Sequence, residues 1–419
     1  MAKRRERQED LWPATKEEAQ ARREYRQRQQ EHRKHQQEKR AESRELARGP
    51  IDLPFCLLVL LLTAIGLVML LSASFPSAYY ETKNNDPTHY FVRQGIFAVL
   101  GVAAMFFLGK INYQRFRGVA TASLFVAIIL LVLVIIPGNP IALTRNNATR
   151  WLGVGDLFTF QPSEVAKLAV VLYFSDSISR KKDRMRTTRY GILPYALWLG
   201  IIAVLMLLEP HLSGTVLILG VGAVLMFVGG IRWGWVLAAL GLACGGVAIL
   251  MSGIISYGQS RINMWRNPFE FAQNEGYQLA QSLISIGSGG LLGVGLGKSR
   301  QKFLYLPEEH NDFIFSIVCE ELGLIGACLI ILVFILLILR GFWIALHARD
   351  RFGALLVVGC MTQISLQTFL NMAVVTGLLP ATGISLPFFS YGGTALALQL
   401  FEMGIVLSVS RQIPAPRNG

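Results

Sequence analysis

The feature that most constrains the fold of this chain is a series of apolar stretches, each close to the length of a membrane span. A helix needs about 20 residues to cross the hydrocarbon core of a bilayer. About ten such stretches are predicted, at residues 53–72, 91–108, 119–136, 165–178, 192–208, 213–229, 233–251, 313–339, 352–376 and 394–410. The 165–178 stretch needs its flanks to span. The predicted fold is an all-α polytopic membrane protein.

The placement of basic residues predicts the topology. The net charge is +13, but the Lys and Arg residues gather in the N-terminal tail, in alternate loops at 110–117, 180–189 and 340–351, and at Arg411. This is the positive-inside pattern with both termini cytoplasmic. The basic excess is therefore a topology signal, and no nucleic-acid partner is expected.

Composition divides the chain into three parts. Residues 1–50 are charged and almost free of aliphatic side chains, which predicts a cytoplasmic tail without a packed core. Residues 51–411 form the predicted transmembrane domain, with a large extracytoplasmic loop at 252–312 between helices 7 and 8. Residues 412–419 form a short cytoplasmic tail. The first fifty residues lack the apolar core of a cleavable signal peptide.

Two apparent motifs do not predict chemistry. The glycine-rich run at 287–299 has Leu292 where a P-loop needs glycine, and no strand is predicted before it, so we expect turns or a backbone that approaches a substrate closely. The five cysteines lie in apolar stretches without a CxxC pair, which predicts buried hydrophobes rather than disulfides or metal ligands.

Asp312 is the strongest candidate for a catalytic residue. It is the last charge before a long apolar stretch, and a carboxylate at a membrane edge is costly unless it has a partner or a function. With a helix starting near Asn311, Asp312 lies in the first turn, where the helix dipole favours the ionised form and burial opposes it. Such a carboxylate suits a general base. His310 and Glu308 are candidate ligands for a divalent cation, Mg²⁺ or Mn²⁺; no organic cofactor is expected.

Other polar residues have structural and functional interpretations of similar weight. Glu164 and Lys167 share a helix face and predict an ion pair, either for packing or on a substrate groove. A stripe of Gln363, Gln367 and Asn371 predicts interhelical hydrogen bonds. The large loop carries five cations that are candidates either for binding a diphosphate or for contacting lipid headgroups: Arg261, Arg266, Lys298, Arg300 and Lys302.

Three long sequence blocks resemble the SEDS family (shape, elongation, division and sporulation), whose members include FtsW, RodA and SpoVE. The blocks are ATRWLGVG with FQPSEVAK at 148–167, the segment from GYQLAQ to CEELG at 276–323, and VVTGLLPATGISLPFFSYGG at 374–393. The resemblance covers residues 53–411, and the tail and the NNATRWLG block look most like FtsW or SpoVE.

The resemblance implies a peptidoglycan glycosyltransferase that polymerises lipid II at the outer face of the bacterial cytoplasmic membrane, with septal cell-wall synthesis in cell division as the expected role. It implies a class B penicillin-binding protein and other division proteins as partners. The catalytic aspartate of the family maps to Asp312, and its groove residues map to Arg150, Trp151, Glu164 and Lys167. Arg261, Lys298, Lys302 and His310 are added as candidate substrate-binding residues.

Two positions depart from the family pattern, and the sequence leaves two rival functions open. Glu209-Pro210-His211 stands where many relatives have Gln-Pro-Asp, and Asn311 replaces the usual Thr. A lipid II flippase would use the intramembrane charges and would need no base at the rim. A non-catalytic scaffold would only activate its penicillin-binding partner.

Overall fold

The computed structural model describes residues 27–31, 49–82, 85–136, 138–145, 148–154, 158–238, 241, 245, 263–273 and 276–413. The chain divides into two compact units, Met1–Leu46 and Ala47–Gly419. In the first unit only residues 27–31 are described, and they are helical. The other described residues belong to the second unit.

Nine of the ten predicted spans are helices within the described residues. They are α3 (Leu53–Glu81), α4 (His89–Gly109), α5 (Phe116–Ile135), α6 (Pro162–Lys181), α7 (Leu193–Leu208), α8 (Leu212–Val228), α12 (Ile314–Leu346), α13 (Arg351–Val375) and α14 (Gly393–Ser410). Most of the predicted 233–251 span lies outside the described residues, of which 233–238 are helical. The prediction of a polytopic all-α membrane fold is confirmed.

Seven of the described helices are long and apolar enough to cross a membrane. The polar α6 and the 17-residue α8 are the described exceptions among the predicted spans. In α6, the full 20 residues from Pro162 to Lys181 are helical, so the flanks that the sequence required are present.

Helix starts follow the capping chemistry of the sequence. The Asp52 carboxylate accepts a hydrogen bond from the Phe55 amide at the start of α3, and the Asp350 carboxylate accepts one from the Gly353 amide at the start of α13. Both side chains satisfy amide groups that a helix leaves unpaired at its first turn. In α6, Glu164 lies in the first turn and Lys181 in the last, in agreement with the helix dipole.

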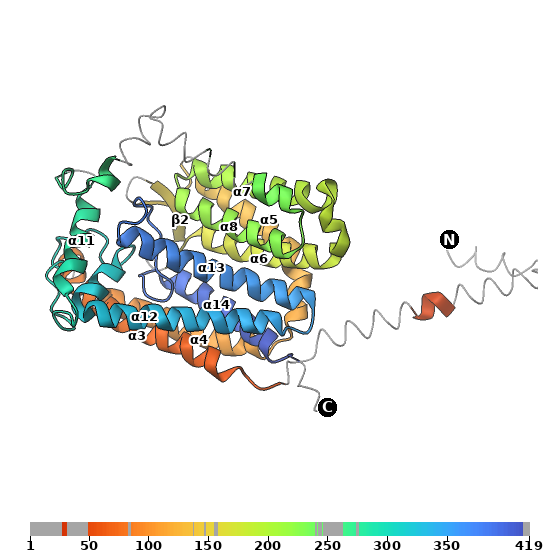
Figure 1. Ribbon diagram of the computed structural model, residues 1–419, viewed down its shortest axis with the longest axis horizontal. Coiled ribbons are helices and arrows are strands. Elements are labelled where there is room, and N and C mark those ends of the chain that lie inside the picture. The colour runs from red at the N-terminus through yellow and green to blue at the C-terminus, as the bar shows by residue number, and fades with distance from the viewer. Residues whose placement is uncertain are drawn as a thin grey trace, which may run out of the picture. The chain divides into compact units, whose positions relative to one another are not determined.

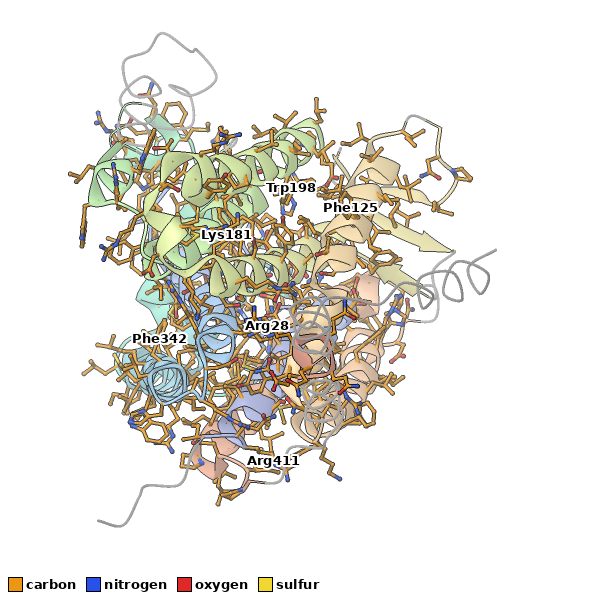
Figure 2. The ribbon with its side chains drawn as sticks, turned by 90° about the vertical axis from the view of Figure 1, so that its right-hand side faces the viewer. Arg28, Phe125, Lys181, Trp198, Phe342 and Arg411 are labelled. Carbon is orange, nitrogen blue, oxygen red and sulfur yellow. The ribbon has the colours of Figure 1, made fainter. Side chains whose placement is uncertain are left out.

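Burial separates central helices from peripheral ones. In α13 and α14, 72% of the most apolar window is buried inside the protein, against 28% in α4, α5 and α12. Figure 1 shows α12, α13 and α14 side by side, with α11 (Tyr277–Gly289) at the end of the bundle where α12 begins. Peripheral helices also contact each other through aromatic side chains: the ring centroids of Phe125 in α5 and Trp198 in α7 are 5.6 Å apart (Figure 2).

Two features of the fold were not predicted. A three-stranded antiparallel sheet of β1 (Ala142–Arg145), β2 (Ala148–Val154) and β3 (Phe158–Phe160) lies between α5 and α6, in the order β1-β2-β3. The Thr394 hydroxyl donates to the Thr159 carbonyl at 3.1 Å and so ties β3 to α14. Cys328 is exposed, whereas Cys56, Cys319 and Cys360 are buried as expected; Cys244 lies outside the described residues.

Candidate functional site

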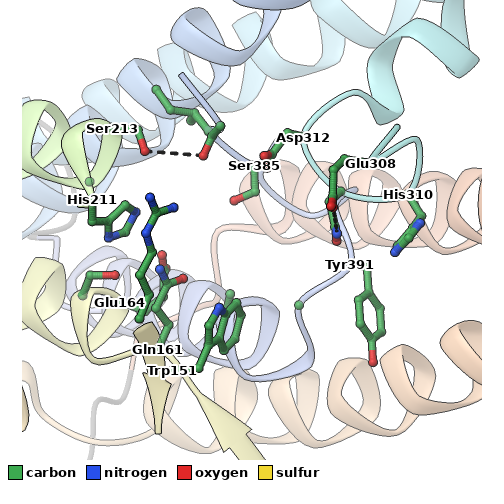
Figure 3. A pocket seen from close by; sticks show the side chains of 18 of the residues that line it. Trp151, Gln161, Glu164, His211, Ser213, Glu308, His310, Asp312, Ser385 and Tyr391 are labelled. Atoms are coloured by element: carbon green, nitrogen blue, oxygen red, sulfur yellow. Dashed lines mark hydrogen bonds between the residues drawn. The ribbon is translucent and has the colours of Figure 1, made fainter. Parts of the chain in front are cut away.

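A cavity of about 1840 Å³ lies at the end of the bundle where α12 begins. Its walls come from α4, β2, α6, the start of α8, and two loops around residues 308–312 and 380–385. Figure 3 shows Trp151, Gln161, Glu164 and His211 on one side and Glu308, His310 and Asp312 on the other. The cavity therefore brings together side chains that are far apart in the sequence.

Asp312 lines this cavity from a backbone that is held on three sides. The Asn371 amide of α13 donates to the Asp312 carbonyl at 2.7 Å. The Ser390 hydroxyl donates to the Asn311 carbonyl at 2.7 Å, and the Tyr391 amide donates to the His310 carbonyl at 2.9 Å. Because these donors come from α13 and from the loop before α14, the backbone that carries the Asp312 carboxylate is tied to two elements of the bundle.

The prediction that Asp312 lies in the first turn of a helix is wrong. α12 begins at Ile314 with Phe313 as its N-cap, so Asp312 lies just outside the helix. A turn in which the Phe313 amide donates to the Glu308 carbonyl occupies the preceding residues. The helix dipole is consequently a weaker influence on the carboxylate than the sequence suggested, because it acts within the terminal turn.

The electrostatic surroundings of Asp312 favour its protonated form. Burial and the neighbouring negative charge of Glu308 raise its pKa to about 7, against the opposing influence of Arg150 and His310. A carboxyl group with a pKa near neutrality can both accept and release a proton under physiological conditions. Asp312 therefore has the chemistry that a general base needs.

Gly383 leaves room for the Asp312 carboxylate. A Cβ atom at this position would lie 3.2 Å from Oδ2 of Asp312, and the backbone φ of +70° is one that glycine adopts without strain. The Ser213 hydroxyl donates to the Gly383 carbonyl at 3.4 Å (Figure 3). The 380–385 loop thus closes against the base because it has no side chain at this point.

Arg150 lies on the β2 wall of the cavity. Its guanidinium donates to the Glu209 carbonyl at 3.3 Å and to the Pro210 carbonyl. Burial lowers its pKa, which the charges of Asp312 and Glu209 oppose. The unpredicted sheet therefore has a clear structural role, because it carries Arg150 and Trp151 into the cavity.

Glu164 and Lys167 form the predicted ion pair, with Nζ and Oε1 2.7 Å apart. Lys167 also donates to Gln367 at 3.4 Å, and Gln367 in turn donates to the Ser385 carbonyl at 3.0 Å. Gln363 donates to the buried Glu402 carboxylate at 3.0 Å. The predicted interhelical role is confirmed for Gln363 and Gln367, whereas Asn371 donates to the carbonyls of two loop residues, Asp312 and Ile384. The ion pair lines the cavity.

His310 reaches the cavity but is fixed by its neighbours. Its ring stacks on Tyr90 at 4.7 Å, and its Nδ1 lies 3.6 Å from the Glu309 carboxylate. Burial lowers its pKa, but the nearby Glu309 carboxylate outweighs this, with help from the charges of Glu308 and Glu81, so the pKa is raised. No group of three or more potential ligands for a metal occurs among the described residues. These side chains thus do not fit a site in which protein ligands alone hold a cation.

The four predicted cations of the large loop that the structure describes do not line the cavity. Lys302 is buried in an ion pair with Glu321, at 2.9 Å, and so the proposal that it binds substrate is not supported. Lys298 and Arg300 are exposed outside the cavity lining, as is Arg266. Arg261 lies outside the described residues.

Other cavity residues were missed or left without a role. Arg93 lines the cavity from α4. It is a charged residue close to the start of the apolar stretch 91–108, and this position was the sequence signal that could have identified it. His211 also lines the cavity, and its Nδ1 has no hydrogen-bond partner among the described residues. Burial lowers the pKa of His211 to about 3 and raises that of Glu209 to about 8.

Comparisons with known proteins agree with this architecture. The family model described as "Cell cycle protein" (FtsW, RodA and SpoVE) matches residues 53–414. A probable peptidoglycan glycosyltransferase FtsW of Geobacter metallireducens is 40% identical over 362 residues, which cover 86% of this chain and 95% of the relative. Stage V sporulation protein E of Bacillus subtilis is 42% identical over 363 residues, with coverage of 86% and 97%.

Two solved structures have the same fold. A chain from a study of how a peptidoglycan synthase complex coordinates polymerization and crosslinking has a TM-score of 0.71 and 27% identity, and the match covers 86% of this chain and 98% of that one. The rod shape determining protein RodA of Thermus thermophilus has a TM-score of 0.63 and 28% identity, with coverage of 87% and 98%.

Proposed function

This chain belongs to the FtsW, RodA and SpoVE family of cell cycle proteins, and on that premise we propose that it is a peptidoglycan glycosyltransferase that polymerises lipid II. The observation that carries the proposal is the position of Asp312, a carboxylate with a pKa of about 7 on the wall of a cavity that also contains Arg150 and Lys167. Curated relatives named as probable peptidoglycan glycosyltransferases support it.

The mechanism uses Asp312 as a general base. A sugar hydroxyl of the acceptor transfers its proton to the Asp312 carboxylate, and the oxygen attacks the anomeric carbon of the donor. The bond from that carbon to the diphosphate breaks, and its electron pair stays on the departing diphosphate oxygen. The carboxylate must be ionised before it accepts the proton, so its pKa sets the pH at which the reaction begins.

The cations that line the cavity stabilise the leaving group. Arg150, Lys167 and Arg93 all line the cavity, and negative charge grows on the diphosphate as the bond breaks. The Glu164 carboxylate pairs with Lys167 and fixes its position. Trp151 lines the same wall and offers an apolar face to a sugar ring. A divalent cation stays a prediction from the sequence, and the proton transfer to Asp312 does not require one.

The proposed setting is the bacterial cytoplasmic membrane at the division septum. The fold is that of a multi-pass membrane protein, and we place both termini in the cytoplasm because the basic loops alternate. Asp312 then faces outward, where a substrate anchored by a polyprenyl chain stays in the membrane. A class B penicillin-binding protein is the proposed partner, supported by the similarity to a chain of a peptidoglycan synthase complex.

A polymerisation assay in detergent tests the proposal against its rivals. Purified protein is incubated with lipid II, with and without the partner, and glycan strands are resolved on a gel. We expect polymer from the wild type and from an Asp183→Asn variant, which changes an exposed acid outside the cavity, and none from Asp312→Asn. A flippase has no leaflets to connect in a micelle and would give no polymer. A non-catalytic scaffold would give no polymer without the partner, and any polymer formed with the partner would be indifferent to Asp312→Asn.

A further inference from the structure

The segment that follows α11 has an unusual surface for a loop in water. Residues 290–305 contain no acidic residue, and their large apolar side chains are exposed: Leu291, Leu292, Val294, Leu296, Phe303, Leu304 and Tyr305. Leu292 is 79% exposed, more than Leu324 (56%) or Leu329 (57%) on the outer surface of the membrane-spanning α12. Such a surface requires an apolar environment to cover it.

The position of this segment along the membrane normal can be counted from the opposite end of the bundle. Arg340 and Asp52 form an ion pair at 2.7 Å, which marks the boundary of the hydrocarbon at that end of α12 and α3. About twenty residues at 1.5 Å per residue cross the ~30 Å core. Counted from Arg340 toward the start of α12, this length ends at Glu320; counted from Asp52 along α3, it ends at Ser72. These counts agree with each other, because the Ser72 hydroxyl donates to the adjacent Glu321 carboxylate at 2.7 Å.

The segment is attached to α12 at this boundary by its backbone. Gly323 interrupts α12 with φ 68° and ψ −172°. The amides of Val294 and Gly295 donate to the carbonyls of Glu320 and Glu321 at 2.9 and 3.0 Å, and the amide of Leu324 donates to the Gly290 carbonyl at 2.9 Å. The loop thus supplies hydrogen bonds that the break removes from the helix. Gly290 lies beside Leu324, on the membrane side of Glu321.

The charges of the segment fit a phospholipid surface. Lys302 is neutralised by Glu321, which leaves Lys298 and Arg300 as the exposed charges of residues 290–305. Lys298 and Arg300 lie two and four residues after Leu296, the last of the three exposed leucines at 291–296. Leucines at the hydrocarbon edge followed by cations form the pattern of a segment that lies in a membrane interface and attracts anionic headgroups.

We propose that residues 290–305 are seated in the membrane interface on the Asp312 side, with Leu291, Leu292 and Leu296 among the acyl chains and with Lys298 and Arg300 on the phosphates of anionic phospholipids. The segment follows α11 at the left-hand end of the bundle in Figure 1. The proposal does not depend on the chemistry of Asp312, and its test therefore uses no activity measurement.

The depth of Leu292 is measured with an environment-sensitive fluorophore on full-length protein in phosphatidylcholine liposomes. A cysteine is introduced at Leu292, at Leu329 in the middle of α12 or at the exposed Asp183 in the short 3₁₀ helix Lys182–Arg186, with Cys244 and Cys328 changed to alanine. We expect lipids brominated near the headgroup to quench the label at 292 at least twofold more than the label at 183. Label 329 should instead be quenched best by deeply brominated lipids. Equal quenching at 292 and 183 would overturn the proposal.

The headgroup preference is measured with the same label. Brominated phosphatidylglycerol should quench label 292 about twofold more than brominated phosphatidylcholine at the same mole fraction, because about two cations concentrate the anionic lipid near the segment. The ratio should fall to one in a Lys298→Gln, Arg300→Gln double variant. A ratio of one in the unmodified segment would refute the assignment of these cations. Quenching that disappears as the protein-to-lipid ratio rises would assign the leucines to a second copy of the chain and overturn the proposal.

Discussion

The pH dependence of the reaction is set by the surroundings of Asp312, and one substitution should move it in a known direction. Burial and the charge of Glu308 raise the pKa of Asp312 to about 7. The base is active when ionised, so the rate should rise with pH through neutrality. Glu308→Gln keeps the size of the side chain and removes a neighbouring negative charge. Since a like charge disfavours ionisation, its removal should lower the pKa of Asp312.

The size of the effect follows from the titration curve. With a pKa of about 7, Asp312 is ~10% ionised at pH 6 and ~90% ionised at pH 8. Removal of a charge close by lowers the pKa by about one pH unit. At pH 6, the ionised fraction then rises to ~50%, so the variant should be about fivefold faster than the wild type at this pH. At pH 8 the two should differ little, apart from the weaker basicity of the variant.

The assay is kcat/KM for lipid II polymerisation in detergent between pH 5.5 and 8.5. Glu308→Asp is the matched control, because it keeps the charge and should leave the midpoint of the profile near 7. A Glu308→Gln midpoint that stays in place or moves upward would show that another group governs the profile and would refute the role given to Asp312.

Three further predictions concern the support of the base and the metal. Gly383→Ala places a methyl group against the Asp312 carboxylate and should lower kcat at least tenfold. The control is Gly377→Ala, at a glycine with a similar positive φ whose added methyl group would contact only side-chain carbons; it should cost ~1 kcal/mol of stability and leave kcat unchanged. Equal kcat values in the two variants would contradict the close contact. Asn371→Leu removes the donor to the Asp312 carbonyl and should lower kcat more than it raises KM. The control Gln363→Leu removes a buried amide that donates to the Glu402 carboxylate and should lower Tm with little change in kcat. A larger loss of kcat in Gln363→Leu than in Asn371→Leu would make Asn371 a packing residue only. Because the described residues contain no group of three metal ligands, chelation of divalent ions should leave the Tm of the substrate-free protein unchanged; a fall of several degrees would reveal a metal bound by the protein.

The membrane-spanning helices were predictable because their signal is local. An apolar stretch of the length of the bilayer has few alternatives to a helix, since backbone groups in hydrocarbon must be paired within the segment. The stripe of Gln363, Gln367 and Asn371 was equally readable, because side chains four residues apart share a helix face.

The β sheet and the fate of the basic loop residues were not predictable, because both depend on distant partners. The strands of residues 142–160 are short and stand between two membrane helices, and β3 is tied to α14 more than 200 residues later. The sequence made Lys302 a candidate for binding a diphosphate, but in the structure it pairs with Glu321, which lies two residues before the break of α12 at Gly323. Charge placement predicted which side of the membrane these cations occupy, but only packing separates a buried ion pair from an exposed cation.

Asp312, which the sequence predicts as a catalytic residue, lines the cavity, but its local conformation was predicted wrongly, for a physical reason. The apolar stretch begins at Phe313, but the helix begins one residue later, because a turn closed by the Glu308 carbonyl occupies the preceding residues. The elevated pKa thus comes from burial and from Glu308 rather than from a balance with a helix terminus.

The measurement that tests the general base most directly is a single turnover with lipid II already bound. Wild-type and Asp312→Asn protein are saturated with labelled lipid II, the amount bound is determined, and the first glycosidic bond is followed over time. We expect binding at least as tight as that of the wild type, because asparagine has the same size and removes a negative charge from the neighbourhood of the diphosphate. The rate should be lower by ~10²–10⁴-fold, the contribution of a positioned base. Bond formation within about threefold of the wild-type rate would contradict the account, because it would leave no role for the carboxylate.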